Sequence, residues 1–174
     1  MYPLLLKFSE EMPANEKNAI SYILRNVGDA VVLNGEYNGF EIKEVLQNFG
    51  KKAFGENGIN TSFFRSKDIV ENLISRIEPN LTTAENGEDT VIYPFGVVNG
   101  IISDNEIKAE NLKLNGRTGI YEEKSFMIVF AKENDFLLSD FDSTVRVLKG
   151  YAVFVPAKMR LEITGEAEII LIHL

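Results

Sequence analysis

The stretch of residues 149–174 constrains the fold of this chain more than any other part of the sequence. It holds three short apolar runs, at residues 151–155, 159–164 and 167–174. Pro156 and the pair Gly165-Glu166 separate the runs and are typical turn residues. In the middle run apolar and polar side chains alternate, which is typical of a strand with one buried face. The last run is almost wholly apolar, which favours a strand inside a sheet. The sequence therefore predicts three consecutive β-strands here.

The same stretch carries a motif. Gly150 and Pro156 stand with five residues between them. This phrase resembles the second sequence motif of the cupin superfamily, in which a Gly-x5-Pro turn leads into a strand with a metal-binding histidine. The histidine position, five residues after the proline, holds Leu161 in this chain. The resemblance implies a mainly β fold, a cupin-like β-sandwich or jelly roll, without a metal ligand at this position.

A second resemblance involves two separate segments. Residues 20–55 are similar to the entry region of type I mannose-6-phosphate isomerases, in which a strand is followed by an Asn-Gly turn, a short helix and a closing glycine. The turn from Asn34 to Gly39 and the closing Gly55 stand in those places. Residues 125–174 are similar to the non-catalytic cupin half that ends the same proteins. The family's central block, with its Gln-Val-His-Pro phrase and zinc ligands, has no counterpart in this sequence. The resemblance implies a shortened relative without the zinc site.

The remaining pattern predicts a single cupin-like domain over residues 1–174. A strand and helix entry segment covers 1–60, a helix and linker cover 61–89, and a β-rich core covers 90–174. Two or three short helices are expected. One has an apolar stripe within residues 40–54, and another spans residues 66–77 with Ser66 or Asp68 as its cap and Pro79 as its stop. Residues 19–24 and 30–33 are predicted to form a hairpin. The predicted strands between the linker and the C-terminal stretch are 91–95, 97–102, 107–114, 125–131, 136–138 and 145–148, with a turn at 115–119.

Composition restricts the class of protein. The chain has 174 residues, 45% of them hydrophobic, so it can bury an ordinary core. It has no cysteine, which excludes disulfides and fits a reducing cytoplasm. Its formal charge is −8, without a block of Lys or Arg, which argues against a nucleic-acid partner. No apolar run approaches the roughly 20 residues of a membrane span, and the first residues do not match a signal peptide. We therefore expect a cytoplasmic protein without nucleic-acid or membrane partners.

The sequence predicts neither a metal nor another cofactor. Met127 and Val129 can be aligned with the His-x-His pair of the first cupin motif, and Glu133 then falls near that motif's carboxylate. Thioether and aliphatic side chains, together with Leu161, do not hold a hard or borderline divalent cation. We expect them to fill the interior of the barrel. His173 is the only histidine, and we expect it at the surface of the last strand.

Four residues are candidates for ligand binding: Tyr93, Glu133, Lys158 and Arg160. Tyr93 begins an aromatic segment that could form a platform for a sugar, although a core strand and a turn explain it equally well. The two basic residues could bind a sugar phosphate through charge-assisted hydrogen bonds. The alternative is that they decorate the surface, because the strand pattern points Arg160 away from the interior. Asp135, Asp140 and Asp142 fit a solvated turn better than a calcium loop.

Three functions remain open. The first is a binding, sensing or assembly module related to mannose-6-phosphate isomerase, with a small carbohydrate or sugar phosphate as its ligand. The second is an active sugar-phosphate isomerase with a non-standard site, for which carboxylates such as Glu122 and Glu123 are available but no catalytic residue can be assigned. The third is a structural protein that associates with itself. Residues 2–6 and 169–174 are strongly apolar, and a homodimer would follow if either run lay at a sheet edge.

Overall fold

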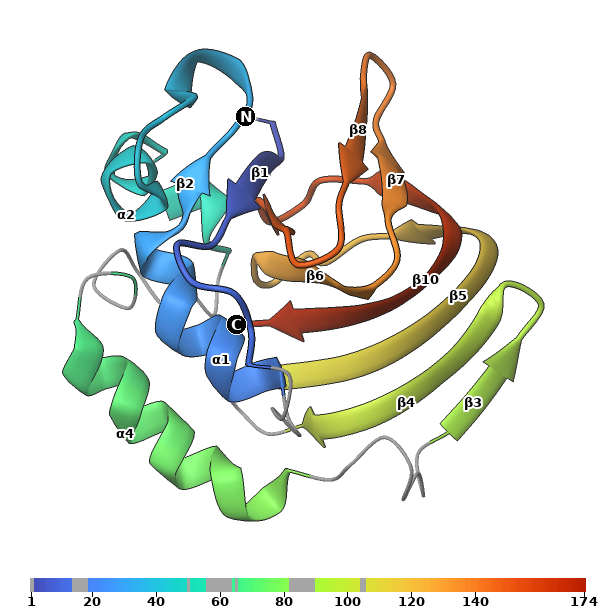
Figure 1. Ribbon diagram of the computed structural model, residues 1–174, viewed down its shortest axis with the longest axis horizontal. Helices are drawn as coiled ribbons and strands as arrows, with labels where there is room; N and C mark the ends of the chain where they lie inside the picture. The colour runs from blue at the N-terminus through green and yellow to red at the C-terminus, as the bar shows by residue number, and fades with distance from the viewer. Residues whose placement is uncertain are drawn as a thin grey trace.

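The computed structural model describes residues 2–13, 19–49, 51–55, 64, 66–81, 90–103 and 106–174. The described residues form mostly antiparallel sheet with three short α-helices and several single 3-10 turns (Figure 1). The strands are β1 (Leu4–Lys7), β2 (Val31–Val32), β3 (Thr90–Tyr93), β4 (Gly96–Ser103), β5 (Lys108–Ile120), β6 (Met127–Glu133), β7 (Phe136–Ser139), β8 (Thr144–Val147), β9 (Ala152–Val155) and β10 (Leu161–His173). The helices are α1 (Ala19–Asn26), α2 (Ile42–Val45) and α4 (Lys67–Ile77), and the 3-10 turns are η1 (Val27–Asp29), η2 (Gly35–Tyr37), η3 (Leu46–Asn48), η4 (Lys51–Ala53) and η5 (Glu78–Asn80).

The strands form a folded-over sheet of the jelly-roll type. The main path runs in the order β2-β1-β9-β6-β10-β5-β4-β3, and β7 pairs with both β10 and β8. The first part of β10 pairs with β7 and its last part pairs with β6, while β5 pairs with it along the whole of its other side. These two long strands therefore belong to both layers of the sandwich, and they curve through the molecule in Figure 1. The predicted mainly β sandwich with short helices is confirmed.

The C-terminal stretch differs from the prediction in one respect. Residues 150–174 form two strands, β9 and β10, and not three. The expected break at Gly165-Glu166 lies inside β10, and the expected turn at 115–119 lies inside β5, opposite it. In a short stretch of sequence a glycine is typical of a turn that ends a strand. Here the glycines lie inside two paired strands and let both strands bend together. The burial pattern is as expected, because Leu161 and Ile163 are buried and β10 lies inside the sheet.

Two apolar cores lie on opposite faces of the main layer. The inner core fills the sandwich, and its large members include Met127, Val129, Phe136, Leu161 and Ile169. The outer core lies between the other face of the same strands and the helices, which cover that side in Figure 1. Alternate residues of β6, β9 and β10 enter the two cores, so these strands are apolar on both faces. This double burial explains the uninterrupted apolar runs in the sequence.

Residues 19–24 correct the predicted hairpin. They form most of helix α1, and of the second expected strand only Val31 and Val32 pair, with β1. The apolar residues Ile20, Ile23, Leu24 and Val27 stand at helical spacing, i, i+3, i+4 and i+7, and all four are buried. Helix α1 lies against α4 and β10. The hairpin prediction was wrong because it gave weight to short apolar runs and not to this period.

The other helical predictions hold in part. Ser66 caps α4 as expected, since its side-chain oxygen accepts a hydrogen bond of 3.4 Å from the amide of Ile69. The helix expected within residues 40–54 is divided into α2, η3 and η4, although its apolar stripe is buried. Phe54 and Phe64 contact Phe126 and Phe154, which ties the entry segment to the sheet. Most of the predicted linker, residues 82–89, lies outside the described residues.

Neither of the two apolar runs that were considered for a sheet edge lies at one. Strand β1 lies between β2 and β9, and β10 lies between β5 and both β6 and β7. Neither apolar run proposed as a dimer contact is therefore an edge. Strand β3 ends the main path of the described sheet, and its Ile92 is 80% exposed. None of the helices within the described residues has the length and hydropathy that a membrane crossing requires.

Candidate functional site

A row of paired residues crosses five strands at one end of the sandwich. Val155 pairs with Met127, Met127 with His173, His173 with Lys108, and Lys108 with Ser103. Because partners in an antiparallel sheet lie on the same face, His173 and Lys108 face the same side as the inner-core residues Met127 and Val155. One layer deeper, Glu110 pairs with Leu171. A polar layer therefore closes this end of an apolar interior.

The interior below the polar layer is apolar at the positions compared with the cupin metal site. Met127 is 2% exposed, Val129 is fully buried and Leu161 is 5% exposed, and all three belong to the inner core. The prediction that they pack inside the sandwich is confirmed. Glu133, by contrast, ends β6 as an exposed residue, and its carboxylate lies 3.1 Å from the ammonium of Lys149. It does not join the three apolar residues.

His173 is the centre of the polar layer. Its side chain is only 13% exposed, so the predicted surface position was wrong. The Nδ1 atom lies 3.1 Å from Oε2 of Glu122, within hydrogen-bond distance. The Nε2 atom is buried and lies 3.4 Å from Oε1 of Glu110, although the two atoms are not aligned as a hydrogen bond. The imidazole is thus held between two carboxylates, one from β5 and one from the loop that follows β5.

Both carboxylates are stabilised in their ionised form. The interaction with His173 is the main cause that lowers the pKa of Glu110, and it outweighs the opposing effect of burial, with help from Lys108. At Glu122 burial is the largest single effect and raises the pKa. It is outweighed by hydrogen bonds from the amides of Lys124 and Glu123 and by His173, so that the pKa is lowered overall. The amide of Lys124 donates to Oε1 of Glu122 over 3.0 Å.

The arrangement is unsuited to holding a metal between the two carboxylates. The two nitrogens of an imidazole point in different directions, so Glu110 and Glu122 lie on opposite sides of the ring and do not converge on one point. Among the described residues, no group of three or more His, Cys, Asp or Glu side chains could hold a metal ion. What the arrangement does is fix the position of two carboxylates at the end of the sandwich.

A groove of about 460 Å³ begins at Glu110 and crosses the ends of β3, β4 and β5. The described residues that line it are Asn80, Val91, Tyr93, Val98, Gly100, Ile101, Ile102, Ser103, Lys108, Ala109 and Glu110. By register Val91, Val98 and Glu110 face the same inward side as the inner core. Glu110 pairs with Gly100, which has no side chain, so the groove is open beside the carboxylate.

Tyr93 is the candidate ligand residue that the structure brings to this groove. Its ring is stacked on that of Phe95, with the centroids 4.9 Å apart and the planes at 9°. Phe95 packs against the inner core, so it supports Tyr93 from below. The tyrosine side chain is 43% exposed and lines the groove. An exposed aromatic ring that is backed by a second ring is a rigid, flat surface of the kind that small ligands stack on.

Lys158 and Arg160 lie in the turn between β9 and β10, close to the backbone of the Glu122 loop. The amide of Lys158 donates to the carbonyl of Glu122 over 2.8 Å. The guanidinium of Arg160 lies 4.8 Å from the ring centroid of Tyr121, a cation–π contact. Both side chains are exposed, and neither lines the groove among its described residues. The four candidate residues therefore do not form one site.

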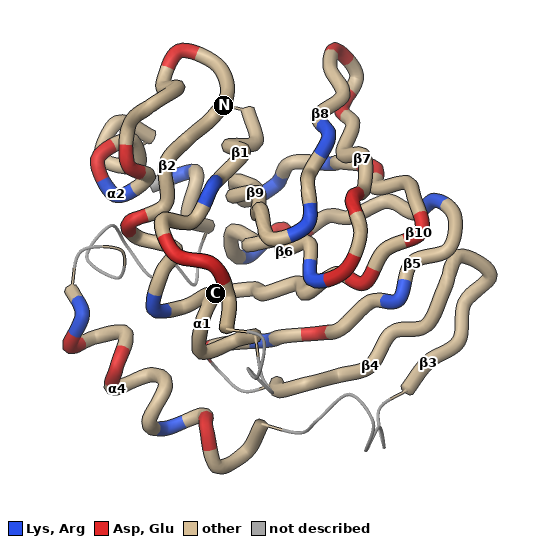
Figure 2. The backbone as a smooth tube through the Cα atoms, in the orientation of Figure 1, with Lys and Arg blue, Asp and Glu red and all other residues tan. Residues whose placement is uncertain are grey.

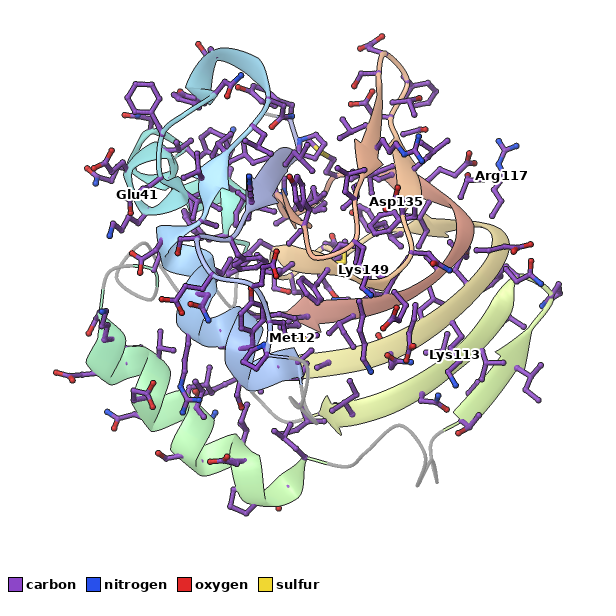
Figure 3. All side chains as sticks on the ribbon, viewed as in Figure 1. Met12, Glu41, Lys113, Arg117, Asp135 and Lys149 are labelled. Carbon is purple, nitrogen blue, oxygen red and sulfur yellow. The ribbon has the colours of Figure 1, made fainter. Side chains whose placement is uncertain are left out.

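The acidic residues Asp135, Asp140 and Asp142 lie in turns, as expected. The carboxylate of Asp140 accepts hydrogen bonds from the amides of Asp142 and Ser143, each 2.8 Å long. Asp135 accepts from the amide of Lys149 over 2.9 Å and pairs with Arg146. Asp135 and Lys149 lie side by side in Figure 3, whereas Arg117 extends away from the sandwich. Strands β5 and β6 carry charges of both signs, whereas β3 and β4 carry none (Figure 2).

A second cavity, of about 290 Å³, lies between α1, α4 and η1 on the helical side. Its charged lining residues are largely paired with one another. Arg25 contacts Glu71 at 2.8 Å, and Lys43 contacts Asp29 at 2.7 Å. These two pairs neutralise four of the charged lining residues, and Lys67 is a further cation among the described residues that line the cavity.

Sequence reasoning missed Glu110 and the inward position of His173. A usable signal was present, because His173 has the same strand parity as Leu171 and Ile169, which are buried in the inner core. That parity places the imidazole on the inner face. The partner carboxylates could not be found in the same way. Their position depends on the register of β5 against β10 and on the course of the loop after β5.

Comparisons with known proteins find similar solved structures only at low identity and partial coverage. No family model matches the chain, and no curated protein matches it in sequence. The mannose 6-phosphate isomerase of Bacillus subtilis is similar in structure, with 23% identity and a TM-score of 0.46 over 49% of this chain and 28% of that chain. The phosphomannose isomerase of Salmonella typhimurium, solved with its substrate and zinc, has 17% identity and a TM-score of 0.41 over 48% of this chain and 22% of that chain. The protein HppE, solved with Fe(II), has 11% identity and a TM-score of 0.45 over 54% of this chain and 59% of that chain. This chain thus covers less than a third of the isomerases' length.

Proposed function

We propose that this protein is a sugar-binding cupin module of carbohydrate metabolism, related to mannose-6-phosphate isomerases but without their zinc site, and that a small carbohydrate binds in the groove beside Glu110. The composition of the groove carries the proposal. It combines an aromatic ring, Tyr93, with a carboxylate, an ammonium group and the hydroxyl of Ser103. Sugars offer an apolar C–H face and several hydroxyl groups, which these side chains complement. The absence of cysteine supports a cytoplasmic location.

The geometry of His173 supports binding over catalysis. A general base needs a nitrogen lone pair within reach of the proton that it removes. Each ring nitrogen of His173 faces a carboxylate, at 3.1 and 3.4 Å, and the side chain is only 13% exposed. The imidazole therefore acts between protein groups, and Glu110 is the member of the cluster that reaches the groove.

The test is the thermal stability of the purified protein with and without sugars. A ligand at 100 times its dissociation constant stabilises the folded state by about 2.7 kcal/mol, which for a chain of this size raises the melting temperature by several degrees. We expect such a shift with at least one of mannose, fructose and glucose or their 6-phosphates. Glycerol at the same concentration is the control for a general solvent effect. Melting temperatures that stay constant with all six sugars would contradict the proposal.

The second candidate function is an active sugar-phosphate isomerase. The closeness of the His173–Glu122 pair to a groove favours it, because an imidazole and a carboxylate are ordinary proton-transfer groups. Isomerase kinetics decide between the two functions. We expect no interconversion of mannose 6-phosphate and fructose 6-phosphate above background, with or without added zinc. A turnover of even about 1 s⁻¹, within the usual range for enzymes, would favour the enzyme.

A further inference from the structure

Glu110 connects the buried imidazole to the groove. Its Oε1 atom lies 3.4 Å from Nε2 of His173 and 3.7 Å from the ammonium of Lys108. Its cross-strand neighbour on the groove side is Gly100, which has no side chain to occupy the space beside the carboxylate. The side chain is 23% exposed, so it is accessible to a ligand but restrained on its buried side.

The restraint comes from His173 and Glu122 together. Glu122 holds the ring through Nδ1, and its own carboxylate is held by the amide of Lys124. Nε2 is buried and has no hydrogen bond in the described structure, yet it faces Glu110. A ring with protons on both nitrogens can donate to both carboxylates, whereas a neutral ring can donate to only one. The imidazole therefore lies on the buried side of the Glu110 carboxylate, 3.4 Å from one of its oxygens, where it can orient the group.

The charge of the groove discriminates between classes of sugar. Lys108 is the only cationic side chain among the described residues that line the groove, and Glu110 already lies near it. An ionised carboxylate accepts hydrogen bonds from sugar hydroxyl groups but repels a phosphate. A phosphate site of the ordinary kind would instead present an excess of Arg or Lys.

We propose that Glu110 anchors the hydroxyl groups of a neutral sugar, that His173 and Glu122 are its positioning residues, and that the site for this reason prefers a neutral sugar to its phosphate ester. This inference rests on the proposed sugar-binding function. It adds the residue that makes the main polar contact, the residues that orient it, and the charge class of the ligand.

Calorimetric titration tests the ligand class with matched pairs: mannose, fructose and glucose, each against its 6-phosphate. We expect a neutral sugar to bind and its 6-phosphate to bind at least tenfold more weakly. The variant Glu110→Gln should lower the affinity for the neutral sugar at least tenfold. The matched control is Glu166→Gln, an exposed carboxylate of β10, which should bind as the unmodified protein does. Tighter binding of the 6-phosphate would overturn the inference and leave the sugar-binding function in place, whereas heat from none of the six sugars would reject both.

A second measurement tests the positioning role without relying on affinity. The chain has one histidine, so every imidazole ¹H–¹⁵N signal in NMR belongs to it and needs no assignment to a residue. Saturation with the neutral sugar should move these signals. Glu122→Gln should move the same signals and lower the affinity, while Glu166→Gln should do neither. An imidazole signal that is unchanged by Glu110→Gln would show that the two side chains are not coupled, and would overturn the positioning role even if the sugar binds.

Discussion

Gly116 of β5 and Gly165 of β10 are direct cross-strand partners, and both have a positive φ, 132° and 148° respectively. This is a backbone conformation that residues with a side chain rarely adopt. Two long strands can therefore bend at the same point without breaking their pairing. The bend carries them from one layer of the sandwich to the other.

The substitution Gly165→Ala tests this bend. A Cβ at this position would meet only ordinary contacts, the nearest being 3.5 Å away, so any loss of stability comes from the backbone conformation. We expect the free energy of unfolding to fall by about 1–2 kcal/mol. Gly119→Ala, in the same pair of strands but without a positive φ, should change it by less than about 0.5 kcal/mol. Urea denaturation of both variants measures the difference, and equal effects would contradict the explanation.

The substitution Leu161→His tests the apolar interior. One imidazole does not meet the three- or four-ligand requirement of zinc, so we expect elemental analysis to find no stoichiometric transition metal in either the variant or the unmodified protein. The variant should be less stable, because a buried ring nitrogen without a partner costs about 1–3 kcal/mol and the packing of Leu161 is lost. The exposed Leu137→His serves as the control. Stoichiometric zinc in the unmodified protein would contradict the prediction of an apolar, metal-free interior.

The stability of the protein should depend on Glu122 and Glu110 at acidic pH. The pKa of each carboxyl is lowered from its ordinary value of 4.5 in the folded protein. Their contribution is therefore fully present above pH 4.5 and is lost as the pH falls below it through the folded pKa. We expect Glu122→Gln to lower the free energy of unfolding by about 1 kcal/mol at pH 7, and to lower it less at pH 3. Denaturation at the two pH values measures this, and a deficit that grows on acidification would be the wrong sign.

The substitution Phe126→Ala tests whether the entry segment and the sheet unfold together. The ring of Phe126 is fully buried and lies 5.7 Å from that of Phe54 and 5.1 Å from that of Phe154, measured between centroids. Its removal should cost about 3–5 kcal/mol. We expect a single transition that coincides in far-ultraviolet circular dichroism and tyrosine fluorescence, for both the variant and the unmodified protein. Two separate transitions would mean that residues 1–60 form a unit of their own.

Self-association, if it occurs through a sheet edge, should use β3. Both runs that the sequence suggested for this role lie inside the sheet, whereas Val91 and Ile92 of β3 are exposed at the end of its main path. We expect light scattering to give the mass of a homodimer at high concentration. Ile92→Lys should return the mass to that of a monomer, and Phe141→Lys, at an exposed position outside β3, should not. A monomer mass at every concentration would reject the dimer.

The β-sandwich could be predicted because the patterns that indicate its strands lie within short stretches of the sequence. The alternation around Leu161 and Ile163 and the apolar run after Gly165 are sufficient to indicate strands and their buried faces. The prediction failed where a short apolar run fits two structures, as in residues 19–24, where helical spacing and packing against β10 decided the outcome. The prediction also failed at Gly165, because a glycine that bends a strand and a glycine that ends a strand give the same pattern in the sequence.

The candidate site was less predictable than the fold. Tyr93 could be proposed because an aromatic residue beside a turn is visible in the sequence, and it does line the groove. Lys158, Arg160 and Glu133 could not be separated from surface charges, and the structure places them outside the groove's described lining. The contact between Glu110 and His173 arises only once β5 and β10 are in register, which is a property of the tertiary structure.

The position of β10 in both layers also determines when the fold can be completed. It comes after every other described strand in chain order, yet β5, β6 and β7 all pair with it. During synthesis β5, β6 and β7 leave the ribosome before β10 does. Until β10 is available, the strand edges that pair with it stay unpaired and the apolar core between them stays incomplete. Contacts between distant parts of a chain form slowly, and unpaired strand edges are prone to aggregate. The yield of native protein in the cell should therefore depend on how well these edges are protected until β10 arrives.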